Sequence, residues 1–323
     1  MHPGSSGFQP HYFPDRGMTK TSQRGEGSNK PEQLPPLVSV GMPVRNEDRF
    51  LEESLHSLLA QDYVNLEIII SDNASTDRTA AICRTFSTRD RRVHYHRFDT
   101  NHGAAENFKR VVTLAQGKYF MWAAGHDLWS PNLVSECVRQ LENEPDGVIA
   151  FGCCTWIDAA GRKMARSSGW IDTRGMVPSA RFFSVFWGNM QPIYGVIKTG
   201  ALKKVPFLSC IGTDLLILSE LTLVGHFIHA TTAEWKRRDF RDLESYRDRM
   251  QRYCSSQFGL SRSFLDRLFP TVRLPLEIAK IVLRSRVSWL EKAGMLLILL
   301  VSLPLRYIIG RQERIDRVSS NNN

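Results

Sequence analysis

The sequence predicts an α/β protein whose sheet is mostly parallel and flanked by helices. From Leu37 to Gly147, short apolar runs rich in β-branched residues alternate with segments of helical period, and turn or capping residues separate them. Strands that alternate with helices form βαβ units, whose strands lie parallel and whose connections are right-handed. The chain has 323 residues, 42% of them hydrophobic, which is enough for a large domain of this kind.

Four strand–helix units are expected before Gly147. The strands are LVSVGMP, LEIIISD, RVHYHRF and KYFMWAA, and the helices are NEDRFLEESLHSLLAQ, STDRTAAICRTF, NHGAAENFKRVVTLAQG and SPNLVSECVRQLENE. Asn46 is expected to cap the first helix, because its side chain can accept a hydrogen bond from a free backbone N–H. In the third helix, Ala104, Phe108, Val111, Val112 and Ala115 recur at helical spacing and are expected on one apolar face.

The pattern after Gly147 is less regular. GVIAFGCCTWID and QPIYGVIKT are expected to be strands, RFFSVFWG an amphipathic segment, GTDLLILSELTLVG a helix, and HFIHATTAEWKRRDF a strand that leads into a basic loop. The chain divides into a disordered tail over residues 1–35, an α/β domain over 36–240, and a helical, basic C-terminal extension over 241–323. The tail is assigned from its Gly, Ser, Pro and charged residues, which show no apolar period.

Charge and cysteine content restrict the partners and the compartment. A formal net charge of +9 suits an anionic partner such as a nucleotide, a nucleic acid or an anionic membrane surface. No nucleic acid is expected, because the basic residues are dispersed and no DNA- or RNA-binding motif is visible. The 6 Cys include no CxxC pair, and residues 1–30 lack the apolar region of a secretory signal. A cytoplasmic protein with reduced thiols is expected.

Polar residues follow the carboxyl ends of three predicted strands. Pro43 to Asn46 follow the first strand, Asp72 ends the second, and Asp127 follows the fourth. In parallel sheets, ligands bind outside the carboxyl ends of the strands, so these loops are expected to form one site. Asp127 has two interpretations: it binds a metal ion, or it caps the turn that begins DLWSPN.

Three segments carry a resemblance to a known family. VSVGMPVRNEDRFLEESLHSLLAQ, EIIISDNASTDRT and NHGAAENFKRVVTLAQGKYFMWAAGHD, in this order and spacing, resemble the family 2 glycosyltransferases over about residues 37–225. The resemblance implies a GT-A fold with a Rossmann-like sheet. It also implies a nucleotide-diphosphate-sugar donor, with a UDP-sugar favoured, a divalent Mg²⁺ or Mn²⁺ ion, and an acceptor sugar or lipid-linked glycan. The implied setting is synthesis of a cell-surface polysaccharide or glycolipid.

The resemblance also implies roles for individual residues. Asp72 would contact the base, Asp127 would bind the ion that bridges the donor phosphates, and Asp214 would be the general base. The other residues expected at the donor are Pro43, Val44, Arg45, Asn46, Glu47, Asn73, Asn101, Gly103, Asn107, His126 and Arg238. The acidic motif of the family usually carries two or three carboxylates, and here His126 stands where the family contacts the donor ribose. One carboxylate suffices for the ion if phosphate oxygens supply other ligands.

Asp214 also has a second interpretation, since a first-turn aspartate stabilises a helix through the helix dipole. With one candidate base and no candidate carboxylate nucleophile, direct displacement with inversion is expected. A protein that binds nucleotide-sugars without catalysis, as a scaffold at a membrane surface, is the alternative.

The C-terminal extension contains an apolar run from Ala293 to Leu305, interrupted only by Ser302. A spanning helix needs roughly 20 apolar residues, so this run is too short to cross a bilayer. Basic residues on both sides of the run suit the anionic face of a membrane. We expect peripheral attachment through residues 272–311, and the alternative is a packed core helix.

Overall fold

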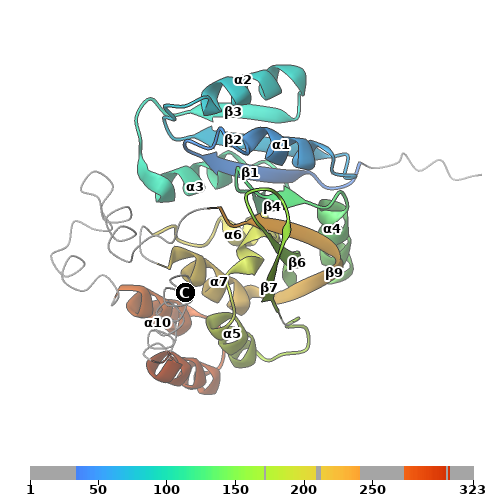
Figure 1. The fold of residues 1–323 in the computed structure, drawn as a ribbon. Coiled ribbons are helices and arrows are strands. Elements are labelled where there is room, and N and C mark those ends of the chain that lie inside the picture. The colour runs from blue at the N-terminus through green and yellow to red at the C-terminus, as the bar shows by residue number, and fades with distance from the viewer. Residues whose placement is uncertain (1–33, 171, 209–211, 241–272, 303–304, 306–323) are drawn as a thin grey trace, which may run out of the picture. The chain divides into compact units, whose positions relative to one another are not determined.

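The computed structural model describes residues 34–170, 172–208, 212–240, 273–302 and 305 (Figure 1). The predicted N-terminal tail, residues 1–33 of it, and the first part of the predicted C-terminal extension, residues 241–272, lie outside the described residues. The domain boundaries at residues 35 and 240 therefore stay predictions.

The described strands form one sheet, in the order β3-β2-β1-β4-β8-β6-β9-β5, with β7 paired to β6. The strands are β1 (Val38–Val44), β2 (Leu66–Asp72), β3 (Val93–Arg97), β4 (Tyr119–Trp122), β5 (Leu128–Trp129), β6 (Gly147–Ile157), β7 (Lys163–Ser168), β8 (Val196–Lys198) and β9 (His226–Arg238). The β3-β2-β1-β4 half is parallel, and so is the β6–β9 pair. Strand β8 is antiparallel to β4 and β6 and joins these two parts. The predicted α/β fold with a mostly parallel sheet is confirmed.

Helices cover both faces of the sheet. Successive side chains of a strand point to opposite faces, so each buried strand contributes apolar side chains to both. In β4, Tyr119 and Met121 pack with α1 (Leu51–Leu59), α2 (Thr79–Arg89) and α4 (Leu133–Asn143). Phe120 and Trp122 of the same strand point to the opposite face. There they pack with α3 (Gly103–Leu114), α5 (Pro178–Trp187), α6 (Thr199–Leu202) and α7 (Thr213–Val224). Both layers leave the carboxyl ends of β1, β2 and β4 open for polar loops.

Four local expectations were wrong. Helix α1 begins at Leu51 with Phe50 as its N-cap residue, so Asn46 does not cap it. In α3 the buried side chains are Asn107, Val111 and Val112, whereas Ala104 and Phe108 are exposed. QPIYGVIKT contains only the short strand β8, preceded by a 3-10 helix over Gln191–Tyr194. The basic residues after Trp235 belong to β9 rather than to a loop, because this strand pairs with β6 as far as Arg238.

The described part of the C-terminal extension is helical. Helix α10 (Arg273–Arg284) is followed by a helix over residues 289–302. These helices pack with α5 and α7 in a third apolar cluster, which includes Leu216, Ile278 and Met295. In Figure 1 they lie beside α5 and α7, far from α2 and β3. Within the described residues, no helix combines the length and the apolar character that crossing a membrane requires.

Candidate active site

Hydrogen bonds join the loop after β1 to the loop after β2. The backbone N–H of Asn46 donates to Ser75 Oγ at 3.0 Å, and Asn46 Oδ1 accepts from the N–H of Thr76 at 2.9 Å. The N–H of Glu47 donates to Thr79 Oγ1 at 2.9 Å. Asn46 and Ala74 both have left-handed backbone angles, with φ of 54° and 56°. Such angles cost energy outside glycine and concentrate at functional sites, so the rest of the loop must hold this pair in place.

Asp72 is fully buried at the end of β2 and is satisfied by protein groups. Its carboxylate accepts hydrogen bonds from the N–H of Ser75 at 2.8 Å, the Tyr95 hydroxyl at 2.8 Å and Arg97 Nη1 at 2.7 Å. Arg97 also donates to the carbonyl of Ser75 at 2.9 Å. Burial, and then the contact with Asp72, raise the pKa of Tyr95 to about 12, so its hydroxyl stays a donor. Asp72 thus fixes the loop of residues 72–75, and its contact with a base stays a prediction.

Asn73 connects this loop to the start of α3. Its amide group donates to Asn101 Oδ1 at 2.8 Å and to the carbonyl of Gly103 at 3.1 Å. Its Oδ1 accepts from the backbone N–H of His102 at 2.8 Å. Gly103 has a φ of 83°, which a side chain would disfavour at this turn. The structure therefore brings Asn73, Asn101 and Gly103 together, as the donor prediction requires.

Asn107 contributes a buried polar atom with no partner in the described part of the chain. Its amide nitrogen donates to the carbonyl of Val44 at 3.3 Å, while its Oδ1 is buried and unpaired there. Buried polar atoms are nearly always hydrogen-bonded, so an orphan acceptor at this edge indicates a missing water or ligand. Among the neighbouring β1 residues, Val44 is buried and Pro43 half-buried, whereas Arg45 is exposed.

Asp127 connects the end of β4 to the distant strand β9. Its carboxylate is 2% exposed, and its Oδ2 accepts from Trp235 Nε1 at 2.9 Å while its Oδ1 accepts from the N–H of Arg238 at 2.9 Å. Burial raises the pKa of this carboxyl, and the nearby His126 lowers it by a smaller amount. The Asp127 carbonyl accepts from Ser54 Oγ of α1 at 2.8 Å. The side chain thus holds β9 against the site.

His126 and Glu47 form a pair beside this carboxylate. His126 Nδ1 lies 3.0 Å from Glu47 Oε2, and His126 Nε2 lies 3.9 Å from Asp127 Oδ1. A histidine whose Nδ1 is held by a carboxylate presents its Nε2 in a fixed direction, as metal-ligating histidines do. Each carboxylate oxygen of Asp127 also keeps a second lone pair. This donor set fits a divalent ion, and metal binding by Asp127 stays a prediction.

Arg238 is buried, and its guanidinium donates hydrogen bonds to several parts of the protein. It donates to the carbonyl of His126 at 2.9 Å, to Glu53 Oε2 at 2.6 Å and to the carbonyl of Ala159 at 3.2 Å. The side chain of Arg238 is 2% exposed, whereas that of Glu53 is 54% exposed. Arg238 therefore joins α1, the end of β4 and the turn after β6. Direct contact with a donor would require some of these bonds to break.

Asp214 lies in the first turn of α7, which follows Gly212 with a φ of 84°. Asp214 is exposed to solvent. Desolvation by the surrounding protein nevertheless raises the pKa of its carboxyl, and the positive charge of Arg237 lowers that pKa by a smaller amount. Arg237 also lowers the pKa of Asp127, so its charge acts on both carboxylates. The role of Asp214 as the general base stays a prediction. Glu53 and Trp235 are not predicted at the site from the sequence, because no local motif marks them. The structure places Glu53 against Arg238 and Trp235 against Asp127.

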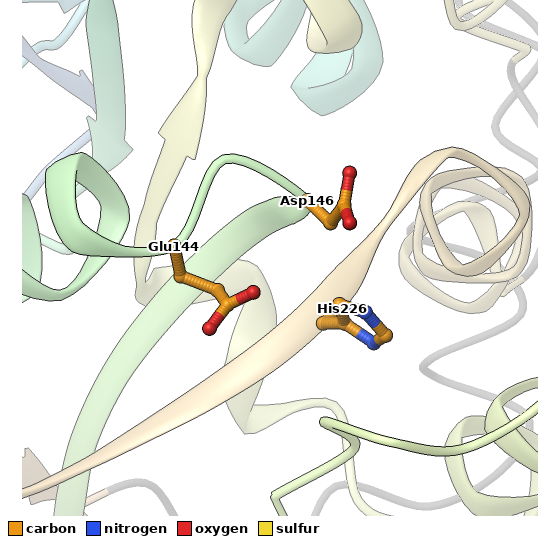
Figure 2. A group of neighbouring side chains, drawn as sticks. All are labelled: Glu144, Asp146 and His226. Carbon is orange, nitrogen blue, oxygen red and sulfur yellow. The ribbon is translucent and has the colours of Figure 1, made fainter.

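A second group of titratable residues lies at the opposite end of β6 and β9. One possible ligand atom from each of Glu144, Asp146 and His226 lies within 4.8 Å of the others (Figure 2). His226 Nδ1 faces the carbonyl of Thr173 at 3.2 Å and the guanidinium of Arg181 at 3.4 Å. A cation beside the histidine disfavours a metal ion there, and we assign no site to this group.

Comparisons with known proteins identify the domain that contains this edge of the sheet. Residues 39–190 match the family model described as glycosyl transferase family 2. The chain carries a family 2 glycosyltransferase domain. The match includes every loop described above except those of α7 and β9.

Relatives of this glycosyltransferase domain come from several bacteria. Glycosyltransferase GlyG of Streptococcus pneumoniae is 31% identical over 116 residues, 36% of this chain and 38% of that protein. The putative teichuronic acid biosynthesis glycosyltransferase TuaG of Bacillus subtilis is 35% identical over 116 residues, 36% of this chain and 45% of that protein. The matches therefore span less than half of these relatives.

The fold of most of the chain resembles that of solved structures. S. aureus TarS 1–349 in complex with UDP-GlcNAc has a TM-score of 0.59 at 16% identity, covering 82% of this chain and 71% of that one. The mannosyltransferase PcManGT from Pyrobaculum calidifontis, in complex with GDP-Man and Mn²⁺, has a TM-score of 0.52 at 15% identity, covering 84% and 72%. The expected GT-A fold with a helical C-terminal extension is confirmed.

Proposed function

We propose that the chain transfers a sugar from a nucleotide-diphosphate-sugar to an acceptor hydroxyl, with inversion and with help from a divalent ion. The observation that carries this proposal is the edge of the sheet at β1, β2 and β4, where hydrogen bonds join three loops of a family 2 glycosyltransferase domain into one surface. The orphan Oδ1 of Asn107 at this edge supports a ligand there.

The donor would lie along this edge. We propose that the loops of residues 43–47 and 72–73 hold the nucleoside, and that Asn101, Gly103 and Asn107 complete its pocket. A UDP-sugar is the donor that we favour. Known structures of the fold support a nucleotide-sugar without fixing the base, since TarS was solved with UDP-GlcNAc and PcManGT with GDP-Man.

Asp127 and His126 would hold the divalent ion, Mg²⁺ or Mn²⁺. Such an ion neutralises the charge of a diphosphate leaving group. The protein's own contribution is rigidity: Trp235 and the backbone of Arg238 orient the Asp127 carboxylate, and Glu47 orients His126. Arg238 is proposed to position this assembly from β9, since internal partners take up its guanidinium.

Asp214 would act as the general base. It takes the proton of the acceptor hydroxyl as that oxygen bonds to the anomeric carbon, while the bond from this carbon to the diphosphate breaks. A raised pKa makes a carboxylate a stronger base, and desolvation raises the pKa of Asp214. The single displacement inverts the anomeric centre.

The acceptor is proposed to be a sugar or a lipid-linked glycan of a cell-surface polymer. Relatives support this class: TuaG is named for teichuronic acid biosynthesis, and WcaA of Escherichia coli, 35% identical over 100 residues, for colanic acid biosynthesis. An acceptor of this class agrees with a cytoplasmic enzyme attached peripherally to the membrane, which is part of the proposal.

The test combines nucleotide binding with turnover. Thermal shift is measured with UDP and with GDP, each with and without Mn²⁺, and release of UDP is measured from a panel of UDP-sugars. We expect stabilisation by one nucleotide that depends on Mn²⁺. Asp214→Asn should keep that stabilisation and lose turnover, whereas Glu220→Gln on the same helix should keep both.

Two outcomes would contradict the proposal in different ways. If neither nucleotide stabilises the wild-type chain, the donor site is wrong. If the nucleotide binds but the wild-type chain and Asp214→Asn show the same background release, the chain is a nucleotide-sugar-binding protein without catalysis.

A further inference from the structure

The helix over residues 289–302 exposes its apolar side chains and turns its charged ones toward the protein. Trp289, Leu290 and Leu300 are 76%, 85% and 74% exposed. The only charged residues of this helix are Glu291 and Lys292. Glu291 accepts the backbone N–H of Ser179 at 2.6 Å, and Lys292, 9% exposed, donates to the carbonyl of Leu283 at 2.9 Å. This is the reverse of an ordinary surface helix, which points its charges to water.

Internal contacts fix this orientation. Met295 and Leu299 are buried against α5, α7 and α10, and Trp187 Nε1 donates to Ser302 Oγ at 2.9 Å. Rotating the helix to bury its outer residues would break these contacts and expose Met295. The outer residues recur at helical spacing and so lie on one face. The members of this outer face are Trp289, Leu290, Ala293, Leu297, Leu300 and Val301.

The neighbouring helix α10 supplies positive charge. Lys280, Arg284 and Arg286 are exposed on α10 and in the turn that follows it. Residues 273–302 hold five basic and two acidic side chains, and Glu277 and Glu291 are the two acids. Glu277 pairs with Lys280 at 2.9 Å, and Glu291 faces inward. The described residues of these two helices therefore carry a net positive charge, and their exposed charged side chains are mostly basic.

We propose that the outer face inserts into an anionic bilayer, with the helix lying in the plane of the membrane. Large apolar side chains would enter the boundary between headgroups and acyl chains, as in interfacial amphipathic helices. Lys280, Arg284 and Arg286 would meet lipid phosphates. The net positive charge of these helices favours an anionic lipid surface over a second copy of this chain, because two copies would bring like charges together.

This surface gives a location to the peripheral attachment in the proposed function, on which it rests, but its test needs no turnover. The full chain is mixed with vesicles of phosphatidylcholine alone or with phosphatidylglycerol added, and the bound fraction is measured by sedimentation. We expect binding to the anionic vesicles, weakened by salt, and less binding to phosphatidylcholine. The double variant Leu290→Glu/Leu297→Glu removes two inserted side chains. The control is Val64→Glu, because Val64 is 71% exposed on the loop before β2.

The double variant should lose about a hundredfold in partitioning, about tenfold for each leucine withdrawn from the acyl boundary. The control should bind as the wild type does. Equal binding of the double variant and the wild type to anionic vesicles would overturn the proposal. A lower melting temperature of the double variant, but not of the control, would also overturn the proposal. It would show that another segment of this chain packs on the outer face. A wild-type dimer that becomes monomeric in the double variant would overturn it in favour of self-association.

UDP binding is measured on the same variants. If UDP stabilises all of them equally while only the double variant loses vesicle binding, the membrane surface is confirmed independently of catalysis. If UDP stabilises none of them, the assignment of a UDP-sugar as the donor fails, and the vesicle result still decides the membrane proposal.

Discussion

Replacing Trp235 with phenylalanine tests whether β9 is held to the site through Asp127. The substitution removes the indole N–H that donates to Asp127 Oδ2 at 2.9 Å, and it keeps an aromatic ring that can stack on Tyr194, whose ring centroid lies 4.7 Å away. A hydrogen bond to a charged group contributes about 1.5–3 kcal/mol, and truncating the indole adds about 1 kcal/mol. The free energy of unfolding should therefore fall by about 2.5–4 kcal/mol.

The matched control is Trp170→Phe. Trp170 Nε1 donates to the neutral carbonyl of Asn189 at 3.2 Å, so this substitution removes the same atoms but only a neutral hydrogen bond. Such a bond contributes about 0.5–1.5 kcal/mol. Unfolding by urea, followed by fluorescence and circular dichroism, should show that Trp235→Phe costs about 1–2 kcal/mol more than the control. Equal losses would refute the idea that the indole N–H holds the carboxylate.

The pH dependence of the Trp235→Phe loss gives an independent check. Burial raises the pKa of Asp127 in the folded protein, so the stability linked to this group is full at low pH and is lost as the pH rises through the folded pKa. Loss of the indole donor should raise that pKa further. The difference in stability between Trp235→Phe and the wild type should then be largest at neutral pH and shrink on acidification. A difference that is constant with pH would contradict this role of Asp127.

Four further predictions concern the site. Asp214→Asn should lower kcat by about 10²–10⁴ with little change in donor affinity, and an unchanged kcat would remove Asp214 from the mechanism. Desolvation raises the pKa of Asp214, and a general base acts only when it is deprotonated. The rate should therefore begin to fall, as the pH is lowered, at a pH above the usual pKa range of an aspartate. A pH–rate profile that falls only within that range would contradict this. His126→Ala should raise the Mn²⁺ concentration needed for nucleotide binding by about 10–100-fold, measured by thermal shift, and an unaltered requirement would exclude His126 as a ligand. Arg97→Met should loosen the loop fixed by Asp72 and weaken UDP binding by about tenfold in calorimetry, whereas equal affinity would show that the ion pair is dispensable.

The placement of the site could be predicted from the sequence. Strand ends are visible as the points where apolar runs stop, and parallel strands bring their carboxyl ends to one edge. The structure confirms the parallel β1, β2 and β4 whose carboxyl ends lie at this edge. Asp72 and Asp127 were predicted from strand ends alone, without any pairing information.

The partners of these carboxylates could not be predicted. Trp235 and Arg238 lie 108 and 111 residues after Asp127 in the chain, and Glu53 lies 185 residues before Arg238. Trp235 and Arg238 reach Asp127 because β9 pairs with β5, which begins at the next residue, Leu128. The pairing of β9 with β6 adds shifts in register that no local pattern indicates. Asn46 shows the same limit, since its hydrogen bonds to the loop after β2 replace the expected helix cap.

The apolar run from Ala293 to Leu305 was ambiguous for a different reason. A helix that is apolar all round can be buried or can face lipid, and the sequence does not say which side chains are covered. The structure separates the two sides: Met295 is fully buried, whereas Leu297 is 62% exposed. The alternative of a packed core helix is met on the inner side, where Met295 and Leu299 are buried, and peripheral attachment stays a prediction.

Hydrogen–deuterium exchange with UDP and Mn²⁺ tests most directly whether the donor binds at the carboxyl edge of β1, β2 and β4. Exchange is followed by mass spectrometry on the full chain, with and without the nucleotide. We expect protection of residues 43–47, 72–76 and 101–107, and of the segment around Asp127, because these loops surround the proposed donor. Protection confined to other regions, for example to the surface around Lys118, Lys198 and Lys204 at the other end of the sheet, would contradict it.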